Sequence, residues 1–335
     1  MNNFSWYNAK SIEDALTQVN STASYEIYRQ SEEAAVFKAG GTDLLDLMKE
    51  GLLKPKTIIN IRELPGLDRI EYSNNDGLRV GANVTLAEMA INKDLNNHYG
   101  ALATAAGEAA TPQLRNMATI GGNLVQRTRC WYFRSYDHPC FRKGGDRCFA
   151  KNGENENHAI LNNGSCVSVH ASSVATALLA YDALVVIVNS RKETKEVPIG
   201  DFFVAPGEDP LRETILEADE IITHIRLAKP ANGTRSFYIK QGARESHDWS
   251  IADVAVVLEM NGKTCQRAAI ALGSASPVPV RSMRAEGALA GNIITQQTAL
   301  QAANLAMERA RPLAKNGYKV PLFINLIQQA ILAAT

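Results

Sequence analysis

The sequence lacks the features that mark exported, membrane-spanning or nucleic-acid-binding chains. Lys+Arg and Asp+Glu both number 35 in 335 residues, so no excess of charge of one sign points to nucleic acid or an anionic membrane. The first residues, Met1 to Trp6, contain neither a basic segment nor an apolar core, and no signal peptide is expected. The most apolar stretch, residues 174–188, is too short to span a bilayer and contains Asp182. The sequence therefore predicts a soluble chain with no membrane span and no nucleic-acid partner.

Motifs that identify several common enzyme classes are also absent. The six histidines are scattered, and none has the H-E-x-x-H spacing of a zinc enzyme. Neither the G-x-G-x-x-G fingerprint of the Rossmann fold nor the lysine spacing of a P-loop occurs. No acid–base or nucleophilic triad is visible. These absences argue against hydrolysis and favour chemistry that a bound cofactor supplies.

Composition and periodicity predict an α+β protein in three parts. The chain is 45% hydrophobic and 21% charged, which is typical of globular proteins, and its length allows two or three domains. The expected boundaries are 1–55, 56–228 and 229–335. Helices are expected at residues 11–19, 43–49, 85–92, 101–110, 172–181, 296–311 and 320–334. Strands are expected at residues 36–38, 57–61, 68–72, 77–81, 184–189, 221–227, 236–241, 252–260 and 267–272.

Two glycine pairs stand in similar settings, each beside a threonine. The first lies in Lys38-Ala39-Gly40-Gly41-Thr42-Asp43-Leu44 and the second in Ala118-Thr119-Ile120-Gly121-Gly122-Asn123. Glycine lets the backbone approach an anion closely, and consecutive N–H groups beside a helix N-terminus attract phosphate. Two such loops that converge would hold the diphosphate of a dinucleotide. Glycine pairs are also common at ordinary tight turns, so the pairs alone leave both interpretations open.

Four of the five cysteines fall within 37 residues. Cys130, Cys140, Cys148 and Cys166 are separated by nine, seven and seventeen residues, and Cys265 lies apart. Four clustered thiolates suit either a tetrahedral zinc ion or a four-iron cluster. No C-x₂₋₄-C knuckle, which structural zinc sites usually contain, is present, so the spacing favours an iron–sulfur cluster over zinc or four free thiols.

Three segments together resemble one protein family. They are residues 39–49, residues 113–124, and Gln126-Arg127-Thr128-Arg129-Cys130, which opens the cysteine region. Their order resembles the FAD-binding (medium) subunits of the xanthine dehydrogenase, or molybdenum hydroxylase, family over nearly the whole chain. Within the family, the chain looks most like the flavoprotein subunits of bacterial periplasmic aldehyde oxidoreductases.

The resemblance implies a fold and a set of cofactor contacts. The fold is a p-cresol methylhydroxylase-type FAD-binding domain in two halves, followed by a smaller C-terminal α+β domain. The four cysteines match ligands of one 4Fe-4S cluster held by an insertion at about residues 127–168. Relatives often have an aspartate where this chain has Ser173, which puts that one contact in doubt. The implied FAD-binding residues are Val36, Phe37, Lys38, Ala39, Gly40, Gly41, Thr42, Asp43, Leu44, Ala118, Thr119, Ile120, Gly121, Gly122, Asn123, Ile222 and Lys240.

By the same resemblance the chain is expected to be an oxidoreductase subunit that relays electrons. Substrate oxidation would occur on a large subunit that carries the molybdenum cofactor. A small 2Fe-2S subunit would pass the electrons to FAD on this chain, and FAD would reduce an external acceptor. The compartment would be the cytoplasm, or the periplasm if a signal-bearing partner exports the folded complex. Two alternatives are a stand-alone FAD-dependent reductase of the same fold and a non-enzymatic scaffold stapled by zinc.

Overall fold

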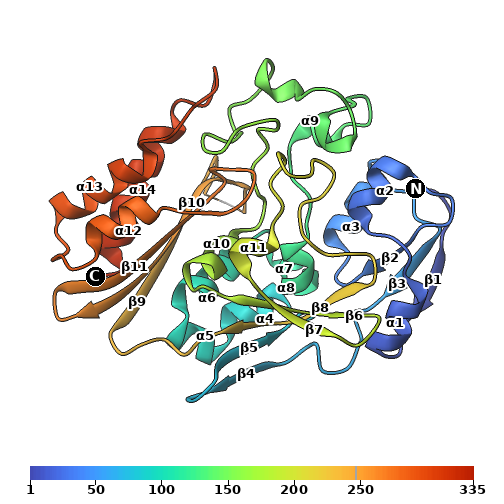
Figure 1. Ribbon diagram of the computed structural model, residues 1–335, viewed down its shortest axis with the longest axis horizontal. Coiled ribbons are helices and arrows are strands. Elements are labelled where there is room, and N and C mark those ends of the chain that lie inside the picture. The colour runs from blue at the N-terminus through green and yellow to red at the C-terminus, as the bar shows by residue number, and fades with distance from the viewer. Residues whose placement is uncertain (246) are drawn as a thin grey trace.

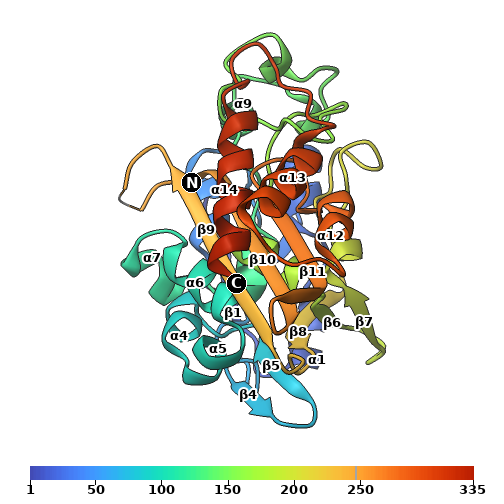
Figure 2. The same ribbon diagram turned by 90° about the vertical axis from the view of Figure 1, so that its left-hand side faces the viewer.

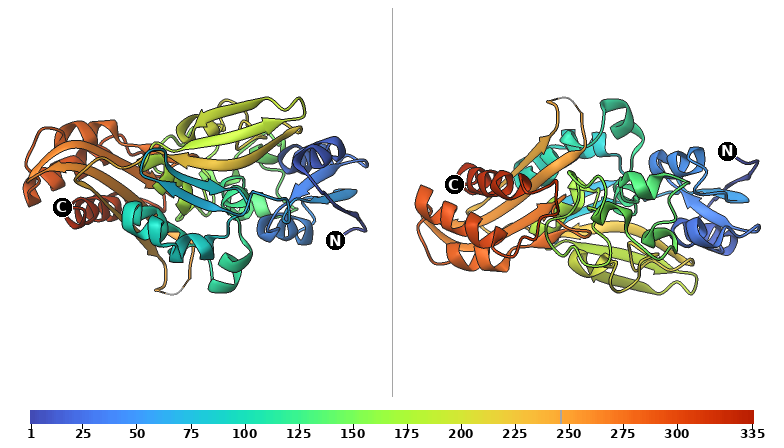
Figure 3. Two further views of the ribbon diagram at one scale, coloured as in Figure 1. Left: turned by 90° about the horizontal axis from the view of Figure 1, so that it is seen from below. Right: turned by 90° about the horizontal axis from the view of Figure 1, so that it is seen from above.

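The computed structural model describes residues 1–245 and 247–335 and confirms the α+β class. The described strands form three separate sheets. The N-terminal sheet has three strands, the middle sheet has five and the C-terminal sheet has four. The N-terminal and C-terminal parts lie at opposite ends of an elongated molecule, with the middle part between them (Figures 1 and 3). No helix among the described residues is both long and apolar enough to cross a bilayer.

The N-terminal part is a small parallel sheet flanked by helices. Strand β3 pairs with β1 on one side and β2 on the other. Because β2 ends at Lys38, the first glycine pair leaves the carboxyl edge of this sheet and leads directly into α3. The elements are β1 (Ser5–Asn8), α1 (Ile12–Gln18), α2 (Ala23–Arg29), β2 (Ala35–Lys38), α3 (Thr42–Lys49) and β3 (Thr57–Asn60).

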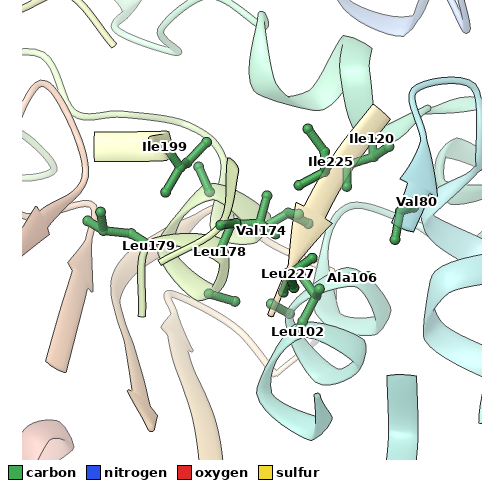
Figure 4. Close-up of a cluster of buried hydrophobic side chains, with 14 of the residues drawn as sticks. Val80, Leu102, Ala106, Ile120, Val174, Leu178, Leu179, Ile199, Ile225 and Leu227 are labelled. Carbon is green, nitrogen blue, oxygen red and sulfur yellow. The ribbon is translucent and has the colours of Figure 1, made fainter. Parts of the chain in front are cut away.

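The middle part is an antiparallel sheet in the order β4-β5-β8-β6-β7, with helices packed against it. Its core contains Val80, Ile225 and Leu227 from the sheet and Leu102 and Leu178 from the helices (Figure 4). Its strands are β4 (Ile70–Ser73), β5 (Gly77–Gly81), β6 (Leu184–Asn189), β7 (Thr194–Pro198) and β8 (Glu220–Leu227). Its helices are α4 (Leu86–Ile91), α5 (Lys93–His98), α6 (Gly100–Glu108), α7 (Pro112–Met117), α8 (Ile120–Leu124), α10 (Ser173–Ala180) and α11 (Ile199–Phe202).

The C-terminal sheet is covered on both faces. Along β10, Ala255 and Val257 belong to the core of the middle part, whereas Val254, Val256 and Leu258 pack under the C-terminal helices. This alternation follows the two-residue period of a strand. The two parts therefore share a continuous core at this sheet. The elements are β9 (Thr234–Gly242), β10 (Ser250–Asn261), β11 (Thr264–Gly273), β12 (Val280–Arg281), α12 (Met283–Leu289), α13 (Gln296–Met307) and α14 (Lys319–Ala333).

The cysteine segment (residues 127–168) is largely irregular and lies at the top of the molecule in Figures 1 and 2. It contains α9 (Trp131–Arg134) and the 3₁₀ turns η1 (Phe141–Lys143) and η2 (Phe149–Lys151). Phe133 packs in the N-terminal core, whereas Ile160 belongs to the C-terminal core. Asn316 donates a 3.0 Å hydrogen bond to the His158 carbonyl and fixes the same end of the segment.

Most expected elements are present, and the discrepancies have local causes. Helix α13 ends at Met307 instead of residue 311, since Pro312 disfavours helical backbone just before it. The loop expected at the second glycine pair is wrong, because Gly121 and Gly122 lie within α8. Helices α2, α5 and α7 were not expected from periodicity, and their seven, six and six residues leave too little pattern to read.

Candidate functional site

The two glycine motifs meet at the wall of one cavity, here called the glycine cavity. A Cβ at Gly40 would lie 2.0 Å from the carbonyl oxygen of Met117, so only glycine permits this contact. Met117 immediately precedes the second motif. Residues of both motifs line the cavity. The expected convergence of the two motifs is therefore confirmed.

The first motif presents unpaired backbone donors. Gly41 has a φ of +79° and is the N-cap of α3, with its carbonyl accepting from the Leu45 N–H at 3.0 Å. The N–H groups of Thr42 and Asp43 have no acceptor among the described residues. First-turn amides of this kind, with the positive end of the helix dipole, bind anionic groups. The first motif thus has the features of a phosphate site.

The second motif instead provides close packing, because its amides are already occupied. Gly121 donates to the Ala82 carbonyl at 2.9 Å, and Gly122 donates to the Thr119 hydroxyl at 3.1 Å. Asn123 donates to the Thr119 carbonyl at 2.8 Å. An added Cβ at Gly121 would come within 3.1 Å of Ala82. The expectation that both motifs offer a nest of free N–H groups therefore holds only for the first.

A buried arginine in the wall of the glycine cavity carries a donor without a partner in the described part of the chain. Arg127 is 2% exposed, and its Nε lies 2.5 Å from Oε2 of Glu213. Its Nη2 has no hydrogen-bond partner among the described residues. A buried donor without a partner is costly, and an anionic ligand in the cavity would supply the missing acceptor. The residues present therefore fit a diphosphate.

A second cavity, here called the lysine cavity, adjoins the first. Thr42 and Gln126 line both cavities, so the two cavities share these residues as part of their walls. Lys240 lines the lysine cavity and donates to the Glu108 carbonyl at 2.7 Å. Burial lowers the pKa of the Lys240 ammonium. A cavity whose lining combines a lysine with other polar side chains and with apolar ones such as Leu114 and Trp249 suits a flat, electron-accepting ring with polar edges.

Trp249 lies at the rim of the lysine cavity; from the sequence it could face a flavin or pack at the seam between two domains, with packing favoured. Its ring lies under the Arg129 guanidinium, with 4.5 Å between the Arg129 Cζ and the ring centroid. Trp249 is 52% exposed, and both residues line the cavity. Cation–π contacts of this kind stabilise exposed aromatic side chains by about 0.5–1 kcal/mol. No sequence pattern links Trp249 to Arg129, because they lie more than a hundred positions apart.

The structure distributes the predicted FAD-binding residues over both cavities. The glycine cavity is lined by Phe37, Lys38, Ala39, Gly40, Gly41, Thr42, Asp43, Leu44, Thr119, Gly121, Gly122 and Ile222. Ala118, Asn123 and Lys240 line the lysine cavity. Val36 and Ile120 are buried in the core and line neither cavity. Arg127, Gln126 and Glu213 are wall residues that the sequence analysis does not assign.

Ser173, the position that the resemblance leaves in doubt, lines the lysine cavity. The neighbouring Ser172 is the N-cap of α10 and accepts from the Ala175 N–H at 2.9 Å. The Ser172 hydroxyl also donates to Asn123 Oδ1 at 2.5 Å. These bonds attach the start of α10 to the second glycine motif without a carboxylate.

The four clustered cysteines are free thiols. Interaction between the side chains of Cys148 and Cys166 raises the pKa of Cys148 and lowers that of Cys166. Burial, with smaller contributions from Cys166 and Cys140, raises the pKa of Cys130 to about 12. Cys265 lies apart, buried in β11, with its Sγ 3.3 Å from the Arg267 carbonyl. Cys265 thus lies apart from the other four, whereas the grouping of those four around one site stays a prediction.

The grouping does not suit one metal ion. Zn–S bonds of about 2.3 Å would draw four thiolates to within about 4 Å of one another. Among the residues described, no three His, Cys, Asp or Glu side chains are placed to hold a single ion. A four-iron cluster is larger and is ligated by four cysteines at its separate irons. The described residues thus show no metal site at the four cysteines, and their role as ligands of a cluster stays a prediction.

Two family models together match almost the whole chain. Residues 2–230 match the FAD binding domain in molybdopterin dehydrogenase, and residues 237–334 match the CO dehydrogenase flavoprotein C-terminal domain. The boundary at about 230 coincides with the loop before β9. The division of the first region into two halves stays a prediction.

Curated relatives and solved structures agree with this assignment. The chain is 34% identical to the FAD-binding subunit of the aldehyde oxidoreductase of Escherichia coli (strain K12), over 91% of this chain and 93% of that one. It is 26% identical to the nicotinate dehydrogenase FAD-subunit of Eubacterium barkeri, over 98% of both chains. Its fold matches carbon monoxide dehydrogenase from Hydrogenophaga pseudoflava with a TM-score of 0.74 and 24% identity, over 99% of this chain and 97% of that one. The chain belongs to the FAD-binding medium subunits of the molybdenum hydroxylase family.

Proposed function

We propose that the glycine cavity holds the FAD diphosphate and that the lysine cavity holds the isoalloxazine ring. The observation that carries the proposal is that the two cavities meet at Thr42 and Gln126, so that one elongated ligand reaches both. The free amides of α3 and the unpaired Nη2 of Arg127 would bind the diphosphate. FAD, when bound, supplies the electron-accepting chemistry of the subunit.

Lys240 and the rim of the lysine cavity would orient the ring. A cation beside the ring attracts the negative charge that reduction adds, and partial burial strengthens this attraction. Leu114 and Trp249 line the cavity and are 45% and 52% exposed. Apolar side chains of this kind at a cofactor opening would contact an electron-transfer partner rather than remain in water. The arrangement supports an electron relay whose cofactor is accessible from outside the chain.

The cysteine segment would hold a 4Fe-4S cluster through Cys130, Cys140, Cys148 and Cys166. Such a cluster, when bound, supplies one-electron transfer. His158 Nε2 lies 3.2 Å from the Cys130 Sγ and would donate a hydrogen bond to a ligating sulfur. Phe133 is 1% exposed and would exclude water from one side of the site. Arg142 is buried beside Cys166 and would offset the negative charge of the ligands.

The chain would work inside a larger complex. Relatives named as medium subunits include the carbon monoxide dehydrogenase medium chain of Hydrogenophaga pseudoflava and the nicotine 6-hydroxylase medium subunit of Paenarthrobacter nicotinovorans. By analogy, the partners here would be a large subunit with the molybdenum cofactor, a small 2Fe-2S subunit and an external electron acceptor. The complex would act on an aldehyde or a heteroaromatic substrate, in the cytoplasm or, if a partner carries an export signal, in the periplasm.

Cofactor analysis of the anaerobically purified chain tests this proposal. We expect about one FAD and about four iron atoms per chain, with negligible zinc. Stoichiometric zinc without iron would contradict the cluster and leave the flavin site standing. A chain that contains neither flavin nor a flavin-binding capacity would contradict the assignment of the two cavities.

A further inference from the structure

The carboxylate of Asp43 lies between the first glycine motif and the cysteine segment. Asp43 belongs to the first turn of α3 and lines the glycine cavity. Its Oδ2 accepts the backbone N–H of Arg127 at 2.8 Å. Its Oδ1 accepts from Arg134 at 2.7 Å and from Arg129 at 2.8 Å. Both oxygens of this cavity residue are therefore bound to the start of the cysteine segment.

The groups that bind Asp43 are close to the first cysteine in the chain. Arg129 directly precedes Cys130, and Arg134 ends the short helix α9 that Cys130 caps. Arg134 also donates to the carbonyls of Thr128 at 2.9 Å and of Arg127 at 3.1 Å. This arginine therefore fixes the backbone on the N-terminal side of Cys130 as well as the Asp43 carboxylate.

The ion pair between Asp43 and Arg134 is largely shielded from water, whereas Asp46, which pairs with the same arginines, is exposed. The side chains of Arg134 and Asp43 are 9% and 13% exposed. Asp46, which binds the same arginines at 3.2 and 3.3 Å, is 48% exposed. Partly buried charge pairs interact more strongly than exposed ones and leave a costly charge behind when one partner is removed. A third carboxylate, Glu50 at the end of α3, lies 3.6 Å from Arg134 and is 30% exposed, so Asp43 is the most buried of the three carboxylates that connect α3 to the segment.

We propose that Asp43 is a positioning residue that couples the state of the cysteine segment to FAD affinity. The inference rests on the proposed function, since it takes the glycine cavity as the diphosphate site. A cluster bound by the cysteines would keep the segment ordered and Arg129 and Arg134 on Asp43, which would then fix the first turn of α3. Loss of that order would release Asp43 from the arginines and leave the diphosphate amides out of alignment. By linkage, bound FAD stabilises the ordered segment to the same extent.

The coupling is measured as the change in FAD affinity when the cluster is removed by oxidation and chelation. In the wild-type full chain we expect cluster removal to weaken FAD binding about tenfold, within the usual range for coupled sites. Asp43→Asn keeps the shape of the side chain and removes its charge. We expect this variant to bind FAD weakly whether or not the cluster is present, so that the dependence on the cluster is lost.

Asp182→Asn is the matched control. Asp182 also binds two arginines, Arg267 and Arg281, but it is 55% exposed and lines neither cavity. We expect this variant to keep wild-type FAD affinity and the wild-type response to cluster removal. Arg134→Met provides a second route, because Arg134 contacts Asp43 but lines neither cavity. Weaker FAD binding in this variant would be transmitted through Asp43 or through Arg127, whose carbonyl Arg134 also binds, and an effect no larger in Asp43→Asn than in Asp182→Asn would rule out the route through Asp43.

Three results separate the coupling from the proposed function. Equal FAD affinity of the wild-type chain with and without its cluster would overturn the coupling and leave both cofactor sites standing. A wild-type chain purified without iron would contradict the cluster. In that case the coupling is tested by Arg134→Met alone, and unchanged FAD affinity of this variant would overturn it. Weakening of FAD binding by Asp182→Asn as large as that by Asp43→Asn would also overturn it.

Discussion

Gly41→Val is expected to leave the purified chain without FAD. Gly41 has a φ of +79°, which a β-branched residue adopts only with strain, and an added Cβ would lie 2.7 Å from the Lys38 side chain. The substitution would therefore displace the first turn of α3, whose Thr42 and Asp43 amides are the proposed diphosphate donors. Flavin absorbance relative to protein absorbance, measured after gel filtration, should fall to background.

Gly51→Val is the matched control for backbone strain. Gly51 follows the other end of α3, has a φ of +76°, and has open space where a Cβ would be added. It lines neither cavity. This variant should lose stability through strain but keep its flavin. Retention of flavin by Gly41→Val, or equal loss in both variants, would contradict the assignment of the first motif to the diphosphate.

Serine at any one of the four clustered cysteines is expected to remove or degrade the iron–sulfur cluster. A serine oxygen is a hard ligand and a poor replacement for thiolate at iron. Iron per chain, measured after anaerobic desalting, should fall well below the wild-type value for Cys130→Ser, Cys140→Ser, Cys148→Ser and Cys166→Ser. The loss should be most severe for Cys140 and Cys166, which are 6% exposed and cannot be replaced by water or a buffer ligand.

Cys265→Ser controls for the loss of a buried thiol. Cys265 is fully buried in the C-terminal core, away from the cysteine segment. The variant should be less stable, since a hydroxyl replaces a buried thiol, but its iron content should be unchanged. Wild-type iron content in the four clustered variants would show that these cysteines are not the ligands.

The sequence predicts those parts of the site that depend on residues close together in the chain. Gly40 and Gly41 follow a strand and precede a helix, an order that is compatible with a backbone anion site and also with an ordinary tight turn. The resemblance to the FAD-binding subunits favours the anion site. The second motif is different, since Gly121 and Gly122 belong to α8 and their amides are paired with Ala82 and Thr119. Paired glycines indicate close approach of the backbone but do not reveal whether the N–H groups are free.

Contacts between distant segments could not be predicted in the same way. Arg127 pairs with Glu213, and Arg129 contacts Trp249, although each pair is separated by more than eighty positions. One sequence gives no measure of which distant residues meet, because many arrangements satisfy the same hydrophobic pattern. The four cysteines could be grouped because they are close in sequence and chemically alike. The contact between Asp43 and Arg134 could not be predicted, since neither the types of these two residues nor their spacing distinguishes them from ordinary surface charges.

Anaerobic reduction of the flavin in the assembled complex tests the electron-relay function most directly. The chain would be co-expressed with the proteins encoded beside it, and the complex purified by gel filtration and mixed with an aldehyde or heteroaromatic substrate under anaerobic conditions. The account predicts that the flavin absorbance of the complex bleaches on substrate addition and returns when an electron acceptor is added. It also predicts that the isolated chain does not respond to substrate. Bleaching by substrate in the isolated chain, or unchanged flavin absorbance in a complex that oxidises its substrate, would contradict the account.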